Sequence, residues 1–390
     1  MMEKIFIFNT IDLIITGITV ALFVIQAAYY VIVYFRPYKK MKSSDVVQTA
    51  MREPVSVIVY AKNESFNLEK YLPSLLAQDY PEYEVIVIND GSTDESDNLL
   101  KIMEGKYPHL YHTFIPQESK YISRKKLALT VGIKAAKYGL LLFTEANCKP
   151  LSKRWIATMA RHYTGGDAEI VLGFCAYRKY KGFFHKLVGY DNLMSGLQYL
   201  TSALAGSPYT GNGRNLSYRK ALFFEHKGYH KSLNLHAGDD DLFINELATK
   251  ENTRIEYAQD SITEMAAIDC FAVWKEMKIS RAATQRYYRG KTLLFFRMER
   301  ASCLLFLSAV VAAIAASVFH NPLVAVAAVL LYLVLFAVKA VVLHKSATML
   351  RQKMWVVWLP LLEIAQSAVH IYIHIYRLFW GKKDYTFNIK

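Results

Sequence analysis

The sequence contains few cysteines and few charged residues. Its four cysteines, Cys148, Cys175, Cys270 and Cys303, are scattered along 390 residues and form no CxxC pair. This spacing indicates neither a zinc site nor a disulfide framework and favours free thiols in reducing surroundings. Charged residues make up 21% of the chain and hydrophobic residues 53%. That composition is too apolar for a disordered protein and more apolar than most soluble enzymes, so it directs attention to membrane segments.

The charge balance is basic. The chain has 47 Lys and Arg against 33 Asp and Glu, a net charge of +14. Such an excess suits nucleic acid, an anionic membrane face or phosphorylated substrates. The basic residues gather beside the long apolar stretches, where attraction to anionic membrane lipids is a sufficient explanation. We therefore expect membrane lipids as partners and no nucleic acid.

The first apolar stretch runs from Ile11 to Phe35 and carries no charge except Asp12, so it is long enough to cross a bilayer. No small-residue cleavage site follows it, which favours a retained anchor over a secretory signal peptide. Basic residues follow instead, and they place the C-terminal end of the span in the cytoplasm: Arg36, Lys39, Lys40 and Lys42.

Two further apolar stretches, Ser302–Val318 and Leu323–Leu343, flank a turn at 320–322 and predict a hairpin across the membrane with both flanks cytoplasmic. A last stretch, Trp355–Phe379, is apolar and aromatic but contains Glu363, His370 and His374. Two interpretations of it stay open, a fourth span or a helix lying along the interface. The predicted organisation is an anchor at 1–45, a cytoplasmic domain at 46–290 and membrane helices at 291–390.

The region between these segments alternates strands and helices. Short apolar runs predict strands at Val55–Tyr60, Glu84–Asn89, Leu140–Thr144 and Glu169–Cys175. Helical spacing predicts helices at Asn67–Gln78, after Asp94, at Ser123–Lys137 and at Lys153–Tyr163. The fold class is therefore α/β, with a mainly parallel sheet and flanking helices. In such sheets ligands bind at the carboxyl ends of the strands.

A polar cluster follows each of the first three predicted strands. The clusters are Ala61-Lys62-Asn63-Glu64, Asn89-Asp90-Gly91-Ser92 and Glu145-Ala146-Asn147. Each alone reads as a cap or a turn. Three clusters in register on consecutive strands instead predict one crevice in which these side chains converge.

These blocks, VSVIVYAKNE, SLLAQDYPEYEVIVINDGSTD and LLLFTEANC, resemble the inverting family 2 glycosyltransferases, and among them the membrane-anchored, cellulose-synthase-like branch. The resemblance covers about Pro54 to Gly290. It implies a GT-A (Rossmann-like) fold and transfer of a sugar from a nucleotide-diphosphate donor.

The resemblance also implies roles on the donor side. It places Asp90 on the nucleotide base, Glu64 near the ribose and uracil, and Ala61 and Asn63 in the same nucleotide-binding block. In the family, paired acids after the third strand hold Mg²⁺ or Mn²⁺ on the diphosphate, and hard oxygen ligands suit such ions. Here Glu145 and Asn147 stand where two aspartates are usual. They are the predicted metal ligands.

Basic residues are the second group expected on the donor side. Lys125 and Lys126 begin a helix where the family has a phosphate-proximal segment, and a solvated cationic helix face is the alternative. Arg286, in Arg286-Tyr287-Tyr288-Arg289-Gly290, matches a family element that binds acceptor and diphosphate, although tyrosine replaces tryptophan. A juxtamembrane basic cluster explains its arginines equally well.

The catalytic base is expected in Gly238-Asp239-Asp240-Asp241-Leu242. Adjacent carboxylates repel one another, so burial should raise at least one pKa, and a raised pKa suits a general base. Alignment on the family pattern places the base at Asp239, and a slip of one residue places it at Asp240. The alternative is a helix N-terminus enriched in acids. On the acceptor side the resemblance implies Asp241, together with Gly213 and Asn215 in a glycine-rich loop.

The sequence thus predicts an integral membrane glycosyltransferase, in a bacterial inner membrane, with its catalytic domain in the cytoplasm. It would transfer a sugar with inversion and without processivity. UDP-sugar is the family's commonest donor, and the acceptor would be a glycan or lipid-linked glycan. A processive polysaccharide synthase and a degenerate nucleotide- or glycan-binding membrane protein are the alternatives.

Overall fold

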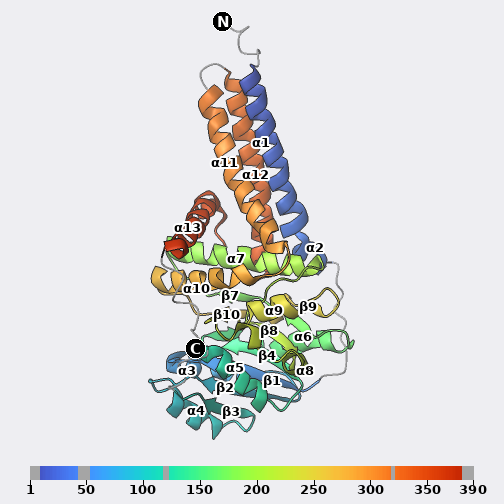
Figure 1. The fold of residues 1–390 in the computed structure, drawn as a ribbon, viewed down its shortest axis with the longest axis vertical. Coiled ribbons are helices and arrows are strands. Elements are labelled where there is room, and N and C mark those ends of the chain that lie inside the picture. Colours follow the sequence, from blue (N-terminus) through green and yellow to red (C-terminus); the bar gives the residue numbers. More distant parts are fainter. Residues whose placement is uncertain (1–8, 43–52, 117–122, 318–320, 380–390) are drawn as a thin grey trace.

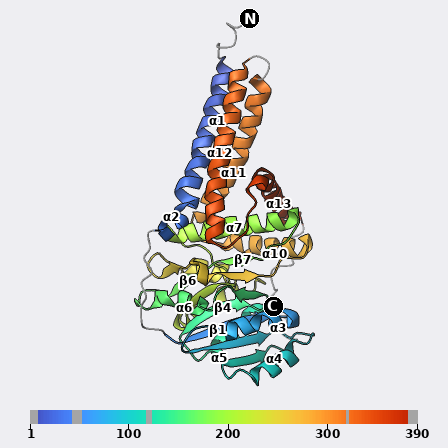
Figure 2. The ribbon, with the colours of Figure 1, turned by 180° about the vertical axis from the view of Figure 1, so that it is seen from behind.

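The computed structural model describes residues 9–42, 53–116, 123–317 and 321–379. A stalk of three long helices rises from an α/β domain, and a layer of helices lies between the two (Figure 1). The same arrangement is seen from behind in Figure 2. Chain segments from both ends of the sequence therefore meet in the stalk, while the middle of the chain forms the α/β domain.

The α/β domain is built on a seven-stranded sheet in the order β3-β2-β1-β4-β8-β6-β9. Strands β1, β2, β3 and β4 are parallel to one another, and β8 runs antiparallel to both of its neighbours, β4 and β6. The strands are β1 Val55–Ala61, β2 Tyr83–Asn89, β3 Leu110–Phe114, β4 Leu140–Glu145, β6 Ile170–Leu172, β8 Leu216–Arg219 and β9 Thr253–Ile255. The expected mixed, mainly parallel sheet is confirmed.

Strand β1 shows why the sheet is covered on both faces. Its residues are almost all buried, and successive side chains point to opposite faces. Val57 and Val59 pack with helices α3, α4 and α6, whereas Ile58 packs with α5, α8 and α9. These helices are α3 Ser65–Leu76, α4 Ser96–Glu104, α5 Arg124–Ala135, α6 Trp155–Ala160, α8 Lys220–Glu225 and α9 Asp241–Leu247.

The predicted strand Glu169–Cys175 is two strands in the structure. Gly173 and Phe174 separate β6 from β7 (Cys175–Tyr177), which joins a second sheet in the order β5-β10-β7, with β5 at Cys148–Pro150 and β10 at Thr263–Met265. A Cβ at Gly173 would lie 2.5 Å from Cγ of Asn215. The chain therefore switches sheets where a buried side chain crosses close to its backbone.

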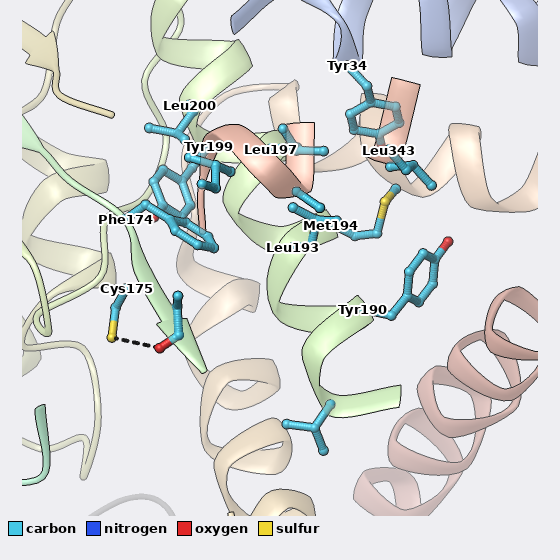
Figure 3. Close-up of a cluster of buried hydrophobic side chains, with 14 of the residues drawn as sticks. Tyr34, Phe174, Cys175, Tyr190, Leu193, Met194, Leu197, Tyr199, Leu200 and Leu343 are labelled. Atoms are coloured by element: carbon cyan, nitrogen blue, oxygen red, sulfur yellow. Dashed lines mark hydrogen bonds between the residues drawn. The ribbon is translucent and has the colours of Figure 1, made fainter. Parts of the chain in front are cut away.

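Two long helices that the sequence analysis did not predict form the layer beneath the stalk. They are α7 (Phe183–Leu204) and α10 (Phe271–Thr284). Figure 3 shows the core at this junction, where Leu193, Leu197 and Tyr199 of α7 lie among Tyr34, Phe174 and Leu343. The long apolar helices and the α/β domain thus share one hydrophobic core.

Four helices are long and apolar enough to cross a membrane, at Thr10–Met41, Thr292–Ser317, Pro322–Met349 and Val356–Phe379. The first comprises α1 (Thr10–Ala28), a π-helical segment (Tyr29–Tyr34) and α2 (Arg36–Lys42). Helices α1, α11 (Thr292–Ser317) and α12 (Pro322–Met349) form the stalk. The turn expected at 320–322 lies partly outside the described residues.

The last helix, α13 (Leu359–Phe379), packs differently from the other three. It contacts α7 and α10 and lies beside the foot of the stalk (Figure 1). Lys339 of α12 forms a buried ion pair with Glu363 of α13, with Nζ 2.7 Å from Oε1. This position favours the interfacial interpretation of 355–379, which stays a prediction.

Candidate active site

The first two polar clusters meet at the carboxyl edge of β1 and β2. Asn63 adopts a left-handed φ of 52°. Its backbone N–H donates to Oγ of Ser92 at 2.8 Å, and its Oδ1 accepts from the N–H of Thr93 at 2.8 Å. The Ala61 carbonyl accepts from the N–H of Asp90 at 2.8 Å. The two loops are therefore held together, as expected for one crevice.

Asp90 is buried at this edge and carries three polar contacts. Arg124 Nη2 lies 2.7 Å from its Oδ1, the Tyr60 hydroxyl donates to its Oδ2 at 2.7 Å, and Lys62 Nζ is 3.8 Å away. Glu64 is half-buried, and its carboxylate accepts from the Asn67 side chain at 2.5 Å. Burial raises the pKa of Glu64.

Glu145, at the end of β4, is held between two cations. Lys125 Nζ lies 2.7 Å from Oε1, and Arg214 Nε lies 2.9 Å from Oε2. Burial would raise the pKa of Glu145, but these two cations lower it strongly. Lys125 also reaches Oδ2 of Asp239 at 3.1 Å. One lysine thus connects the carboxyl end of the sheet with the acidic segment.

The three adjacent aspartates have three different environments. Asp239 is buried, and its one described ion-pair partner is Lys125. Burial raises its pKa; Lys125 opposes that shift and the neighbouring Asp240 adds to it. Asp239 also lines the cavity that opens from this cluster. A raised pKa at such a position is expected of a general base. Between the two candidates, these environments favour Asp239 over Asp240.

Asp240 caps helix α9 and is fully engaged. One oxygen accepts from the backbone N–H of Gly213 at 2.9 Å, and the other lies 3.1 Å from Arg281 Nη1. Burial would raise its pKa, but Arg281, Lys125 and the backbone donors lower it. The helix N-terminus named as the alternative is therefore also present, with Asp240 as its capping residue.

Asp241 is buried and links α9 to α10 and the segment after it. Its Oδ2 accepts from the Tyr288 hydroxyl at 2.8 Å and from the Thr284 hydroxyl. The residue before the aspartates, Gly238, has φ +103°, and a Cβ there would lie 2.6 Å from Leu242 Cδ1. A side chain at 238 would be strained, which explains why this position holds no acid.

The two lysines of α5 have different roles in the structure. Lys126 is fully buried, and its ammonium donates to the backbone carbonyls of Leu235 at 3.0 Å and Ala237 at 2.7 Å, and to that of Ser232. These carbonyls belong to the segment that leads into Asp239. Lys126 therefore holds that segment, and Lys125 is the lysine that faces the cavity.

Several predicted residues lie away from this cluster. Asn215 is fully buried just before β8, where its side-chain amide donates to the carbonyls of Phe174 and Ser261 at 2.8 and 2.7 Å. Arg286 is exposed and stacks on the ring of Tyr287 at 4.6 Å. Neither lines the cavity. The roles predicted for Asn215 and Arg286 were based on motif matches, and in the structure both side chains lie outside the cavity.

Arginines that the sequence analysis did not single out occupy the site instead. Arg214 and Arg281 both line the cavity. Arg214 stands between the two residues picked from the glycine-rich loop, and Arg281 lies five positions before Arg286. Their ion pairs join segments about 70 and 41 residues apart in the chain. No local pattern indicates such pairings.

A cavity of about 390 Å³ opens from this cluster. Lys125, Glu145 and Asp239 line one end, and Glu299 of α11 and Glu363 of α13 line the other. Helices α7 and α10 supply residues between the two ends. The cavity thus leads from the carboxyl edge of the sheet to the helices predicted to lie in the membrane.

The side chains at the predicted metal position do not fit a divalent cation well. Both oxygens of Glu145 are in ion pairs, and the Asn147 side-chain oxygen accepts from the Cys148 thiol at 3.3 Å. Among the residues that the structure describes, no three His, Cys, Asp or Glu side chains are grouped as metal ligands.

The mixed, mainly parallel sheet and its flanking helices have the GT-A architecture, and the polar clusters lie at the carboxyl edge of that sheet. The sequence profile of the family described as "Glycosyl transferase family 2" matches residues 56–226. This part of the chain thus matches the family that the sequence blocks resemble.

Two curated relatives are similar to part of the chain. The chain is 32% identical over 127 residues to a poly-beta-1,6-N-acetyl-D-glucosamine synthase of Staphylococcus epidermidis, covering 32% of this chain and 29% of the synthase. It is 28% identical over 122 residues to glycosyltransferase AglE of Haloferax volcanii, covering 30% of this chain and 38% of AglE. These matches span well under half of each relative.

A solved structure resembles the whole chain. The mannosyltransferase PcManGT of Pyrobaculum calidifontis, in complex with GDP-Man and Mn²⁺, matches with a TM-score of 0.61 and 18% identity. The match covers 95% of this chain and 100% of the mannosyltransferase. At this identity the likeness shows the fold alone.

Proposed function

We propose that this protein transfers a sugar from a nucleotide-diphosphate donor to a hydroxyl group of a glycan or lipid-linked glycan, with inversion and one sugar at a time. The observation that carries the proposal is a buried carboxylate, Asp239, which lines the cavity that leads to the long apolar helices. Lys125 joins Asp239 to Glu145 at the carboxyl edge of the sheet. The residues expected to bind the nucleotide, Asn63, Glu64 and Asp90, follow strands β1 and β2 at the same edge.

The mechanism is a single displacement. The acceptor oxygen bonds to the anomeric carbon as the bond from that carbon to the phosphate oxygen breaks. The electron pair of the broken bond leaves with the nucleoside diphosphate, and the acceptor proton passes to Asp239. The raised pKa of Asp239 makes it a better proton acceptor than an ordinary aspartate. One displacement inverts the anomeric centre.

The surrounding residues orient the base. Lys126 holds the segment before Asp239, and Asp240 fixes the loop at Gly213. The neighbouring Asp241 anchors the helix that follows. Asp240 and Asp241 each accept from several donors, whereas the one described ion-pair partner of Asp239 is Lys125 and its pKa is raised, so we assign the proton transfer to Asp239.

The acceptor enters from the membrane side in this proposal. The cavity reaches α11 and α13, so an acceptor attached to a lipid can present its glycan hydroxyl to Asp239 while its lipid stays among the apolar helices. We place the protein in a bacterial inner membrane with residues 46–290 in the cytoplasm, because basic residues follow the first span.

We propose UDP as the nucleotide of the donor, because it is the commonest carrier in the family. The mannosyltransferase of similar fold was solved with GDP-Man. That structure also holds Mn²⁺, an ion of the kind that the sequence predicts at Glu145 and Asn147. A metal bound there would supply positive charge to the diphosphate. The ion pairs of Glu145 oppose it, and no step above depends on it.

The test is transfer by the purified protein in detergent from a panel of UDP-, GDP-, CDP- and dTDP-sugars, with the anomeric configuration of the product read by NMR. Inverted product, abolished by Asp239→Asn, is the expected result. Retained configuration, or full activity in Asp239→Asn, would overturn the mechanism.

The similarity to a polysaccharide synthase favours a second candidate, processive synthesis. Product length distinguishes the two. A single added sugar at limiting acceptor supports the first proposal, and long products formed while most acceptor remains unused support the synthase.

A further inference from the structure

The side chains around Glu145 form an arrangement suited to a diphosphate. Lys125 and Arg214 approach the two oxygens of one carboxylate, at 2.7 and 2.9 Å. A carboxylate and a phosphate present similar pairs of acceptor oxygens, and both bind lysine and arginine through charge-assisted hydrogen bonds. Donors that converge on a carboxylate can therefore transfer to a phosphate without rebuilding the site.

Both cations have hydrogen-bonding capacity left for a ligand. Arg214 uses Nε on Glu145, and within the described residues no hydrogen bond involves its two terminal nitrogens. Its side chain lines the cavity and is about one-fifth exposed. Lys125 has three N–H donors, with contacts to Glu145 and Asp239, and it lines the same cavity.

A divalent metal ion is the alternative source of positive charge, but this position offers it few free ligands. Asn147 supplies a neutral amide oxygen, which already accepts from Cys148. Glu145 is the one carboxylate of the predicted metal pair, and both its oxygens are in ion pairs. A divalent ion would have to displace the two cations or lie beside them.

We infer that Lys125 and Arg214, rather than a divalent metal ion, bind the diphosphate of the donor and stabilise the negative charge that develops on it as the sugar leaves. Glu145 holds the two cations side by side at the end of β4 until the donor arrives. This inference rests on the proposed function, since it concerns the same donor site.

The test measures nucleotide binding to the full-length protein in detergent by thermal shift. UDP, GDP, CDP and dTDP are each added in EDTA, in Mn²⁺ and in Mg²⁺. A ligand that binds the native state raises the apparent unfolding temperature. We expect one nucleotide to give the same shift in EDTA as in either metal. We expect Lys125→Met and Arg214→Met each to weaken its binding about tenfold or more in EDTA.

Two further variants keep the test decisive. Lys101→Met removes an exposed lysine of α4 that pairs with Asp97, and it should leave nucleotide binding unchanged. Asn147→Asp restores a second carboxylate and should add a metal-dependent component to the shift. The unfolding temperature of each variant without nucleotide identifies any that fails to fold, and Arg214→Lys, which keeps the charge, then replaces Arg214→Met.

The outcomes separate the two claims. A shift that requires Mn²⁺ or Mg²⁺ in the wild-type protein overturns the inference and leaves the proposed function standing. Unchanged binding in folded Lys125→Met and Arg214→Met proteins also overturns it. The absence of a shift with every nucleotide in every buffer overturns the proposed function itself.

Discussion

Replacing Lys126 by methionine should damage the protein in a different way from the same change at Lys125. The two lysines are neighbours at the start of α5, but Lys126 is buried and donates to three backbone carbonyls, whereas Lys125 faces the cavity. Lys126→Met should lower both stability and kcat. Lys125→Met should weaken donor binding.

The size of the stability loss follows from two opposing effects. Three buried carbonyls lose a charged donor, at about 2 kcal/mol each. Against this, methionine removes the cost of burying an ammonium group. Burial lowers the pKa of Lys126 from 10.5 to about 8, which corresponds to about 3 kcal/mol. The expected net loss is about 3 kcal/mol. The lysine is still protonated near neutral pH, so these hydrogen bonds are present under ordinary conditions.

The assay combines thermal unfolding of the detergent-solubilised variants with steady-state kinetics. Lys126→Met should unfold at a clearly lower temperature and show a reduced kcat with KM for the donor changed little, because the segment that carries Asp239 is no longer held. Lys126→Arg should recover part of both. If Lys126→Met matches the wild type in stability, or if it raises KM for the donor as Lys125→Met does, the assignment of Lys126 as a positioning residue is wrong.

Three other changes test the site and the helical layer. Because burial raises the pKa of Asp239, kcat/KM should fall as pH drops through a value above the usual aspartate pKa, and a pH profile with no such acidic limb would exclude Asp239 as the base. Lys339→Met should cost about 3–5 kcal/mol by leaving Glu363 buried and unpaired, and the double change with Glu363→Met should recover most of the loss in unfolding temperature. Gly196→Ala should destabilise by about 1–3 kcal/mol, because its Cβ would lie 2.2 Å from the Phe174 ring; Phe174→Leu in the same chain should relieve it, and unchanged stability of the single variant would contradict the packing.

The part of the fold that local sequence patterns could predict is the parallel half of the sheet. Strands β1, β2 and β4 are short runs of buried apolar residues, and each was placed to within one residue at either end. Such runs are typical of strands covered on both faces. The polar residues that follow them lie at one edge for the same reason, since parallel strands end together.

The antiparallel half and the helical layer were not predictable in this way. Strand β8 has four residues and lies within the loop expected around Gly213. Helix α7 carries apolar residues around most of its surface, because it is covered by the α/β domain on one side and by the membrane helices on the other. Its burial therefore gives no one-sided helical pattern to read from the sequence.

The chemistry of the site shows the same division between local and long-range information. The motif Asp239-Asp240-Asp241 could be found in the sequence, but three like residues in a row do not reveal which one is basic. Their partners decide that, and the partners come from α5, the loop before β8, and α10. Donors around Asp240 lower its pKa, and hydroxyl donors hold the side chain of Asp241 in place. Asp239 has a raised pKa and lines the cavity. A variant in which these three aspartates are replaced by other acidic residues should therefore lose activity unless it keeps the separate contacts of each position.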